Sequence, residues 1–470
     1  MNIAKMSALE IRAAIGNKQL SAVEVMSDTL ERMTALEPAL NAFVTATPEL
    51  AMEAAKAADK AVMAGEPLGR LQGIPLSVKD LIHVGGVRTT FGSRTRATHI
   101  AEADAPSVER VRAAGAGIIG KTTTTEFGSK AGSGDSPLTG ITYNPWNLAK
   151  SPGGSSAGAA ASVAAGVTPF ALGTDGGGSV RIPSSLCGLF GIKAQFGRVP
   201  VFPTSATPTL AHVGVLSRTV RDAALLLQTV SGYDGRDPAS VSERTPDFIA
   251  ACDMPVQGLR IAWSPTLGYA KPTAEVRMIT ETAVRRFEDL GCSIELVENV
   301  IDDPIDLWMA DFYAGIGVTL KDDLQHRRDL LDPALAEVLQ GRLHESVDAY
   351  YTKVFSRYRL REKVRQLFQR YDLLLTPTLP VSSVDVGMNV PRELPDRNMV
   401  SWSYYTYPFN LTGNPAASIP CGFDANGMPV GLQIVAGFNR EADILRAAAS
   451  FEVSSPWVDT YPIGRSLIKK

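Results

Sequence analysis

The chain has 470 residues and a net charge of −3, with 20% charged and 45% hydrophobic residues, which is ordinary globular composition. The even scatter of charges disfavours a nucleic-acid partner, and four widely spaced cysteines do not make a disulfide framework. Because neither a signal segment nor a bilayer-spanning stretch is evident, we expect a cytoplasmic protein with no membrane partner.

The N-terminal part of the chain has helical periodicity. Residues 7–65 are expected to form helices, and Ser21 stands three residues before Glu24 as a capping box. Strands and helices then alternate, which is typical of an α/β fold. In chain order we expect a strand at 73–81, a helix at 106–114, a strand at 117–121, a helix at 157–165 and a strand at 168–173.

The same alternation continues to the C-terminus. Residues 235–255 are polar and are interpreted as a surface connection. Helices are expected at 273–290 and 334–370, and short apolar strands at 373–375, 416–420 and 432–435.

One segment imitates a phosphate-binding loop. Residues 115–122 match both GxGxxG and GxxxxGK[ST], but those motifs need a strand before the glycines and a helix after them. Here a helix comes first and the strand lies inside the motif, so Gly115 is interpreted as the end of a helix. No two of the five histidines have metal-ligand spacing, and no GxSxG marks a serine for a Ser-His-Asp triad.

Ser179 is the first candidate for chemistry. Three glycines, Gly176, Gly177 and Gly178, precede it. Successive amides of such a run can point into one concavity, which suits the oxyanion of acyl transfer. A flexible glycine-rich loop is the alternative, but the segment is wedged between an apolar strand and Arg181-Ile182-Pro183.

A serine hydroxyl needs a base, and a lysine can serve only when it is neutral. Lys79 lies in an apolar strand, where burial disfavours the ammonium form, although a surface lysine is the commoner outcome. Ser155 and Ser156 stand at a Gly-Gly entry to an alanine-rich helix. They could cap that helix or relay a proton, and the local pattern leaves both open.

Taken together, these segments resemble the amidase-signature family. The resemblance is carried mainly by Gly73 to Asp80, Pro152 to Ser156, Gly173 to Pro183 and Cys187 to Lys193, and extends more weakly over nearly the whole chain. It implies an α/β fold with a single large domain, in which helices cover both faces of a central mixed β-sheet. An N-terminal helical layer at 1–65 would precede the catalytic part at 66–470, with its signature core at 73–200.

The resemblance also implies roles for residues. Ser179 would be the acyl-accepting nucleophile, Ser155 the bridging serine after a cis peptide, and Lys79 the base. No metal or cofactor is implied. The glycines Gly176, Gly177 and Gly178 would form the oxyanion hole, and the supporting residues would be Ser156, Thr174, Asp175 and Arg181.

The substrate is less well indicated. The segment Glu126 to Pro137 lacks the Ser-Ser-Thr-Glu run found in the transamidosome enzymes, which makes it closer to catabolic amidases. We therefore expect hydrolysis of a small amide, anilide, carbamate or urea-like compound. The alternative is the glutaminase (A) subunit of a glutamyl-tRNA amidotransferase, a complex with RNA as its partner. Phe127, Ser133 and Trp402 are candidate pocket residues, and a homodimer would suit the family.

Overall fold

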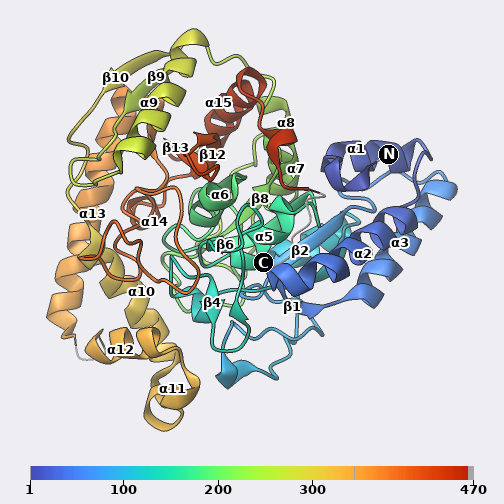
Figure 1. Cartoon of the computed structure of the whole chain (residues 1–470), viewed down its shortest axis with the longest axis horizontal. Helices are drawn as coiled ribbons and strands as arrows, with labels where there is room; N and C mark the ends of the chain where they lie inside the picture. Colours follow the sequence, from blue (N-terminus) through green and yellow to red (C-terminus); the bar gives the residue numbers. More distant parts are fainter. Residues whose placement is uncertain (1, 343–344, 464–470) are drawn as a thin grey trace.

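A computed structural model describes residues 2–342 and 345–463. Its centre is one mixed β-sheet, which confirms the expected α/β architecture (Figure 1). A separate hairpin joins β4 (Asp135–Ser136) to β5 (Gly140–Ile141). In spatial order the strands of the large sheet are β1 (Phe43–Ala46), β3 (Gly117–Thr122), β2 (Pro75–Lys79), β6 (Phe170–Asp175), β8 (His212–Ser217), β7 (Phe190–Lys193), β12 (Ala416–Phe423), β13 (Pro429–Ala436), β11 (Leu373–Pro377), β9 (Arg260–Trp263) and β10 (Ser293–Leu296).

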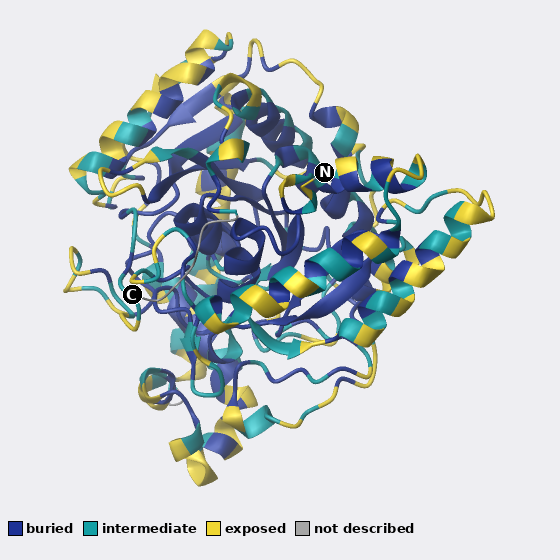
Figure 2. Ribbon diagram, turned by 45° about the vertical axis from the view of Figure 1, so that its right-hand side comes forward, coloured by how far each residue is buried: buried dark blue, intermediate teal, exposed yellow. Residues whose placement is uncertain are grey.

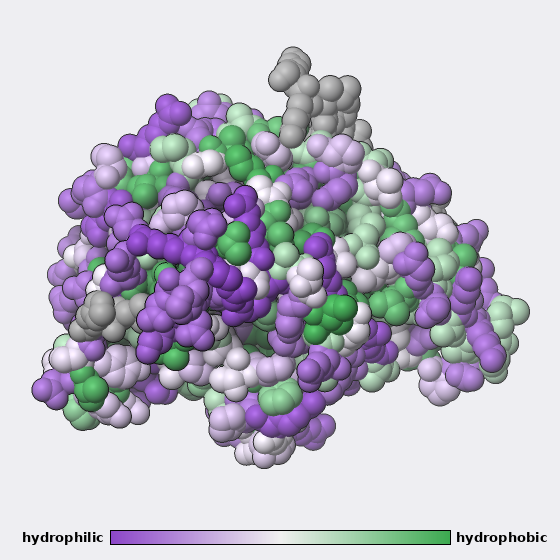
Figure 3. Space-filling model, turned by 90° about the horizontal axis from the view of Figure 1, so that it is seen from below, coloured by the Kyte–Doolittle hydropathy of each residue, from purple (hydrophilic) through white to green (hydrophobic). Residues whose placement is uncertain are grey.

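Helices cover both faces of this sheet, and their outer sides carry the exposed residues while the strands are buried (Figure 2). Seen from below, hydrophilic side chains are interrupted by smaller hydrophobic groups (Figure 3). The helices are α1 (Ala8–Gly16), α2 (Ala22–Leu40), α3 (Pro48–Met63), α4 (Pro106–Ala113), α5 (Ala157–Ala164), α6 (Arg181–Cys187), α7 (Val220–Val230), α8 (Phe248–Ala251), α9 (Ala274–Asp289), α10 (Ile305–Thr319), α11 (Lys321–His326), α12 (Pro333–Arg342), α13 (Val347–Arg370), α14 (Pro408–Leu411) and α15 (Glu441–Ser454).

The N-terminal segment is helical with one exception. The capping box of Ser21 and Glu24 is present at the start of α2, as predicted. However, β1 lies within the segment expected to be wholly helical, and it pairs antiparallel with β3. A strand this short has too little periodicity to be recognised without its partner. The first helices are therefore joined to the main sheet by a strand of their own.

The long helix expected at 334–370 is two helices. α12 ends at Arg342 and α13 begins at Val347, where the Ser346 side chain accepts a hydrogen bond from the amide of Ala349. Serine is a favoured N-cap because its oxygen satisfies an amide that has no partner within the helix. The cap at Ser346 is a local signal that the sequence interpretation missed.

The glycine segment at 115–122 has the order expected of a helix end. α4 comes first, Gly115 has a φ of +89°, and β3 begins at Gly117. No helix opens after the glycines, so no row of free helical amides faces a phosphate there. In the part of the chain that the structure describes, no helix is long and apolar enough to cross a membrane.

The sheet order determines where the candidate residues meet. β2 and β6 are far apart in the sequence but run side by side and parallel, with Ser77 opposite Ala171. Lys79 is the last residue of β2, and the glycine loop begins directly after β6. α5, which follows Ser155 and Ser156, contacts β2, β6 and β8. Three distant segments therefore converge at one edge of the sheet.

We expect Gly158→Ala to destabilise this convergence. A Cβ at Gly158 would lie 2.1 Å from the carbonyl oxygen of Ala42 and 2.6 Å from the amide nitrogen of Thr123, so backbone would have to move. Such overpacking costs about 3 kcal/mol of unfolding free energy. The melting temperature should fall clearly. The control is Gly341→Ala, a helical position with open space, which should gain about 0.5–1 kcal/mol. An unchanged melting temperature for Gly158→Ala would contradict the close packing of α5.

Candidate active site

Lys79 is fully buried at the end of β2, whose five residues are all buried. Its Nζ donates to Ser155 Oγ at 2.7 Å, to Ser156 Oγ at 2.9 Å and to the carbonyl oxygen of Thr174 at 3.4 Å. Burial lowers the pKa of Lys79 well below its usual value, and the negative charge of Asp175 only partly opposes this. An uncharged amine in contact with two hydroxyls can accept a proton from either.

The two serines at the start of α5 do not act as helix caps. The residue at the N-cap position is Ser156, and its side chain caps no helical amide. Its hydroxyl instead donates to the carbonyl oxygen of Thr174 at 3.3 Å. The peptide bond between Gly154 and Ser155 is cis, as the family resemblance implies. Both hydroxyls are directed to the buried lysine, so the helix-capping interpretation is wrong.

Ser179 follows the glycine loop and lines the same cavity as Ser155. Among the described residues, its hydroxyl has no hydrogen-bond partner. The amide of Gly178 donates to Asp175 Oδ1 at 2.8 Å and is thus not free for a ligand. In the described chain the amides of Gly176, Gly177 and Ser179 meet no acceptor. The predicted set of oxyanion donors is corrected accordingly, with Gly178 left out.

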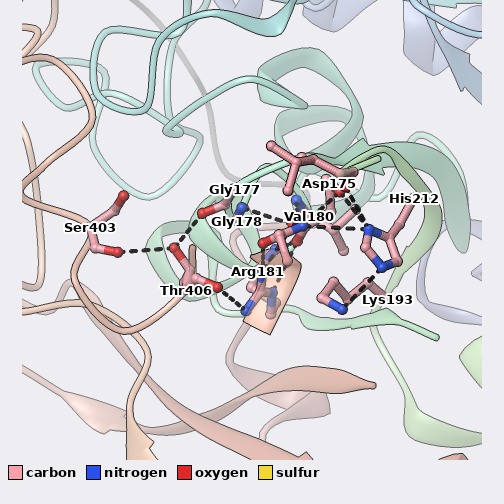
Figure 4. Close-up of polar contacts among 12 residues, drawn as sticks. Asp175, Gly177, Gly178, Val180, Arg181, Lys193, His212, Ser403 and Thr406 are labelled. Carbon is pink, nitrogen blue, oxygen red and sulfur yellow. Dashed lines mark hydrogen bonds and ion pairs between the residues drawn. The ribbon is translucent and has the colours of Figure 1, made fainter. Parts of the chain in front are cut away.

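A buried ion pair holds this loop (Figure 4). Arg181 donates to Asp175 at 2.8 and 3.0 Å, and neither side chain is exposed. Burial alone would raise the pKa of Asp175, but the guanidinium of Arg181 outweighs it and holds the pKa below its usual value. Arg181 also donates to the Thr406 carbonyl oxygen and to the side chains of Gln433 and Asn410. The loop is thereby anchored to the C-terminal part of the chain.

Two further buried groups were missed from the sequence. Lys193, at the end of β7, and His212, at the start of β8, lie 3.3 Å apart behind the loop, with both rows of contacts leading toward Asp175. Burial lowers the pKa of both well below their usual values. Lys193 follows an apolar run just as Lys79 does, so the same signal could have found it. His212 was considered only as a metal ligand.

The cavity beside Ser155 and Ser179 has a volume of about 450 Å³. Phe127 lines it, as predicted, and its ring stacks on Phe91 with centroids 5.5 Å apart and planes 5° apart. The rest of the wall is largely apolar and includes Leu81, Ile82, Val201, Phe202, Pro203, Val213 and Phe312.

The other two predicted pocket residues do not line this cavity. Trp402 is fully buried, with its indole N–H donating to the carbonyl oxygen of Asn389. Ser133 is buried with a hydroxyl that meets no partner in the described chain. Trp402 belongs to a core cluster with Tyr404 and Tyr405, so its large side chain fills the interior. Proximity in the sequence did not reveal which aromatic side chains face the site.

Charged groups at the cavity are few and mostly engaged. Arg96 donates to Asp323 at 3.1 Å. His83 borders the cavity, and burial, helped by the positive charge of Lys121, lowers its pKa to about 4. No cluster of three metal-ligating side chains occurs within residues 2–342 and 345–463. The cavity therefore presents hydroxyls, free amides and apolar walls.

Comparisons with known proteins agree over nearly the whole chain. A family model described as Amidase matches residues 24–445. An acylamidase from Rhodococcus erythropolis is 37% identical over 472 aligned positions, which cover 98% of each chain. The glutamyl-tRNA(Gln) amidotransferase of Synechococcus sp. (strain JA-3-3Ab) has one component that is 36% identical, and the match covers 94% of this chain and 90% of that component.

Solved structures lead to the same family. A bacterial aryl acylamidase, described as one of the amidase signature enzymes, superimposes with a TM-score of 0.92 at 31% identity. That match covers 98% of this chain and 99% of the other. The chain therefore belongs to the amidase-signature family of amide-hydrolysing enzymes.

Proposed function

We propose that this protein is a serine amidohydrolase that cleaves the carbon–nitrogen bond of a small amide through an acyl-enzyme on Ser179. In this proposal Ser155 relays protons and Lys79 is the base. The observation that carries it is the buried Lys79, whose Nζ lies 2.7 Å from Ser155 Oγ and whose pKa is lowered by burial. A surface lysine would stay protonated and could not take a proton at neutral pH.

The proposed cycle has two halves. Lys79 takes the Ser155 proton while Ser155 takes that of Ser179, and Ser179 Oγ bonds to the carbonyl carbon. When the carbon–nitrogen bond breaks, the leaving nitrogen receives a proton from Ser155, which regains one from Lys79. A water molecule then attacks the acyl-enzyme and gives its proton along the same route. The acid leaves, Ser179 recovers its proton, and no cofactor is needed.

Charge on the carbonyl oxygen is the second requirement. We propose that the amides of Gly176, Gly177 and Ser179 stabilise it, since they meet no acceptor among the described residues. Donors set in place before the reaction need no reorganisation, and losing one costs about 3 kcal/mol in the barrier. In this proposal Asp175 and Arg181 act indirectly: their ion pair holds the loop that carries the donors.

The cavity wall supports an apolar substrate group. Phe91, Phe127, Phe202 and Phe312 all line it, and aromatic rings favour offset or edge contacts with another ring. A volume of about 450 Å³ suits a small molecule. We propose an amide or anilide with one aromatic or aliphatic group, with carbamates and urea-like compounds of similar shape as further candidates.

The alternative is the glutaminase component of a glutamyl-tRNA(Gln) amidotransferase, which the 36% identity to such a component favours. Glutamine carries an α-ammonium and an α-carboxylate, and both need charged or polar partners when they leave water. Arg96 is already paired with Asp323, and the facing wall is aromatic. The apolar lining therefore favours the stand-alone amidase. A cytoplasmic location and the lack of a nucleic-acid partner stay predictions from the sequence.

Ser179→Ala is expected to remove the nucleophile without unfolding the protein. Hydrolysis of an amide substrate should fall by about 10⁴-fold or more, as for other serine hydrolases that lose the attacking hydroxyl. A fluorophosphonate probe should label the wild type on the peptide containing Ser179. Turnover retained by a folded Ser179→Ala variant, or a label mapped to another serine, would remove the assignment.

The pH dependence of hydrolysis should report Lys79. Because burial lowers the pKa of Lys79, the neutral amine forms as pH rises through that lowered value, and kcat/KM should rise with it to a plateau. Lys79→Met should lower kcat by about 10³-fold and remove this rise. The exposed Lys56→Met is the matched control and should change neither. A Lys79→Met enzyme with the wild-type profile would show that another group is the base.

Phe127→Ala tests the aromatic wall. Loss of the ring should lower kcat/KM for an anilide about tenfold more than for a short aliphatic amide, because only the larger group reaches the ring. Phe423→Ala, on the exposed side of β12, should affect both alike. An equal loss with both substrates would assign Phe127 to packing alone, and preferred turnover of glutamine would favour the glutaminase.

A further inference from the structure

The outer side of α13 carries an apolar stripe that nothing in the described chain covers. This helix runs along one edge of the molecule (Figure 1). Leu360 and Val364 are its buried residues and face inward. Four large apolar side chains face outward with high exposed fractions, and we call them the α13 stripe: Val347 (71%), Tyr351 (54%), Phe355 (60%) and Tyr358 (63%).

The spacing of these residues puts them on one helix face. Steps of four, four and three residues return to the same side of a helix with 3.6 residues per turn. The rings of Tyr351 and Phe355 lie 6.3 Å apart and so form a continuous surface. Exposed aromatic groups of this kind are enriched at protein interfaces. The stripe therefore has the properties of a contact surface.

The charges beside the stripe distinguish two residues. Lys353 pairs with Glu345, and Arg357 pairs with Asp311, so these four are satisfied within the chain. Among the described residues, Asp348 has no ion pair and Arg359 donates only to Ser356 Oγ. Asp348 and Arg359 lie about three turns apart and thus on the same flank of the stripe.

From this arrangement we infer that the α13 stripe binds a second copy of this chain, with the two α13 helices antiparallel. The pairs Val347/Tyr358, Tyr351/Phe355 and Asp348/Arg359 share a midpoint at about residue 353. A twofold axis there sets the stripe against itself. Equivalent flanks meet in an antiparallel pair, so Asp348 of each copy lies opposite Arg359 of the other, twice by symmetry.

Surface next to the stripe extends this contact. Tyr358 also borders a groove of about 650 Å³, where Arg361 lies over the ring of Phe438 at 5.7 Å. A stable dimer buries about 800 Å² on each partner, more than four side chains provide. The groove adds area at the end of the stripe, and none of these residues lines the cavity at Ser179.

A second copy fits better than a lipid surface. Asp348 and Thr352 lie on the flank that a membrane-bound helix would turn toward the headgroups, where basic residues are favoured. A carboxylate there is repelled by anionic lipid but is neutralised by the arginine of an antiparallel copy. The stripe is also only about four turns long.

Charge reversal with rescue tests the inference, with the full-length chain studied by sedimentation velocity over a range of concentrations. The wild type should be a dimer. Asp348→Arg and Arg359→Asp should each raise the dimer dissociation constant about tenfold or more. The double variant D348R/R359D restores opposite charges across the axis and should return toward the wild type. Phe355→Glu should give a monomer, whereas Met63→Glu, at an exposed position of α3, should not.

Melting temperature and amide hydrolysis should stay unchanged in all these variants, which separates loss of dimer from loss of fold. A monomeric wild type would overturn the inference, as would a double variant no better than either single one. Wild-type binding to vesicles of anionic phospholipid, lost in Phe355→Glu while the protein stays monomeric, would assign the stripe to a membrane surface instead.

Discussion

The candidate site depends on one buried ion pair, between Asp175 and Arg181. Asp175 ends a strand and Arg181 begins a helix, and the glycine and serine loop lies between them. Bringing two charges out of water is costly unless both are fully hydrogen-bonded, and here each has several partners. The result is a loop rich in glycine that nonetheless has one conformation. Its free amides all belong to residues that the pair leaves uncovered.

Two buried lysines show how surroundings decide chemistry. Lys121 lies on the strand next to that of Lys79, and burial lowers the pKa of both. Lys121 meets the carboxylate of Asp80 at 3.1 Å, which favours its charged form. Lys79 meets only hydroxyls and a carbonyl oxygen, so nothing in direct contact compensates an ammonium charge. The same residue type thus serves as a structural ion in one position and suits a proton acceptor in the other.

Much of this could be predicted because the signals are local. An apolar run interrupted by one lysine identified the end of β2, and three consecutive glycines identified the loop before Ser179. What failed depends on tertiary contacts. The strand β1 exists through its pairing with β3, the amide of Gly178 is occupied by a carboxylate across the loop, and the large ring of Trp402 fills the core. None of these is visible in residue order, since each depends on a partner elsewhere in the chain.

The order of strands has a consequence for the newly made polypeptide. Lys79 and Ser155 are 76 residues apart, and the contact between them needs β2 and β6 already aligned. Before that alignment the lysine is in water and protonated, and the serines are ordinary alcohols. Reactivity is therefore a property of the finished sheet. A nascent or partly unfolded chain carries a dormant nucleophile, unable to acylate itself or its neighbours.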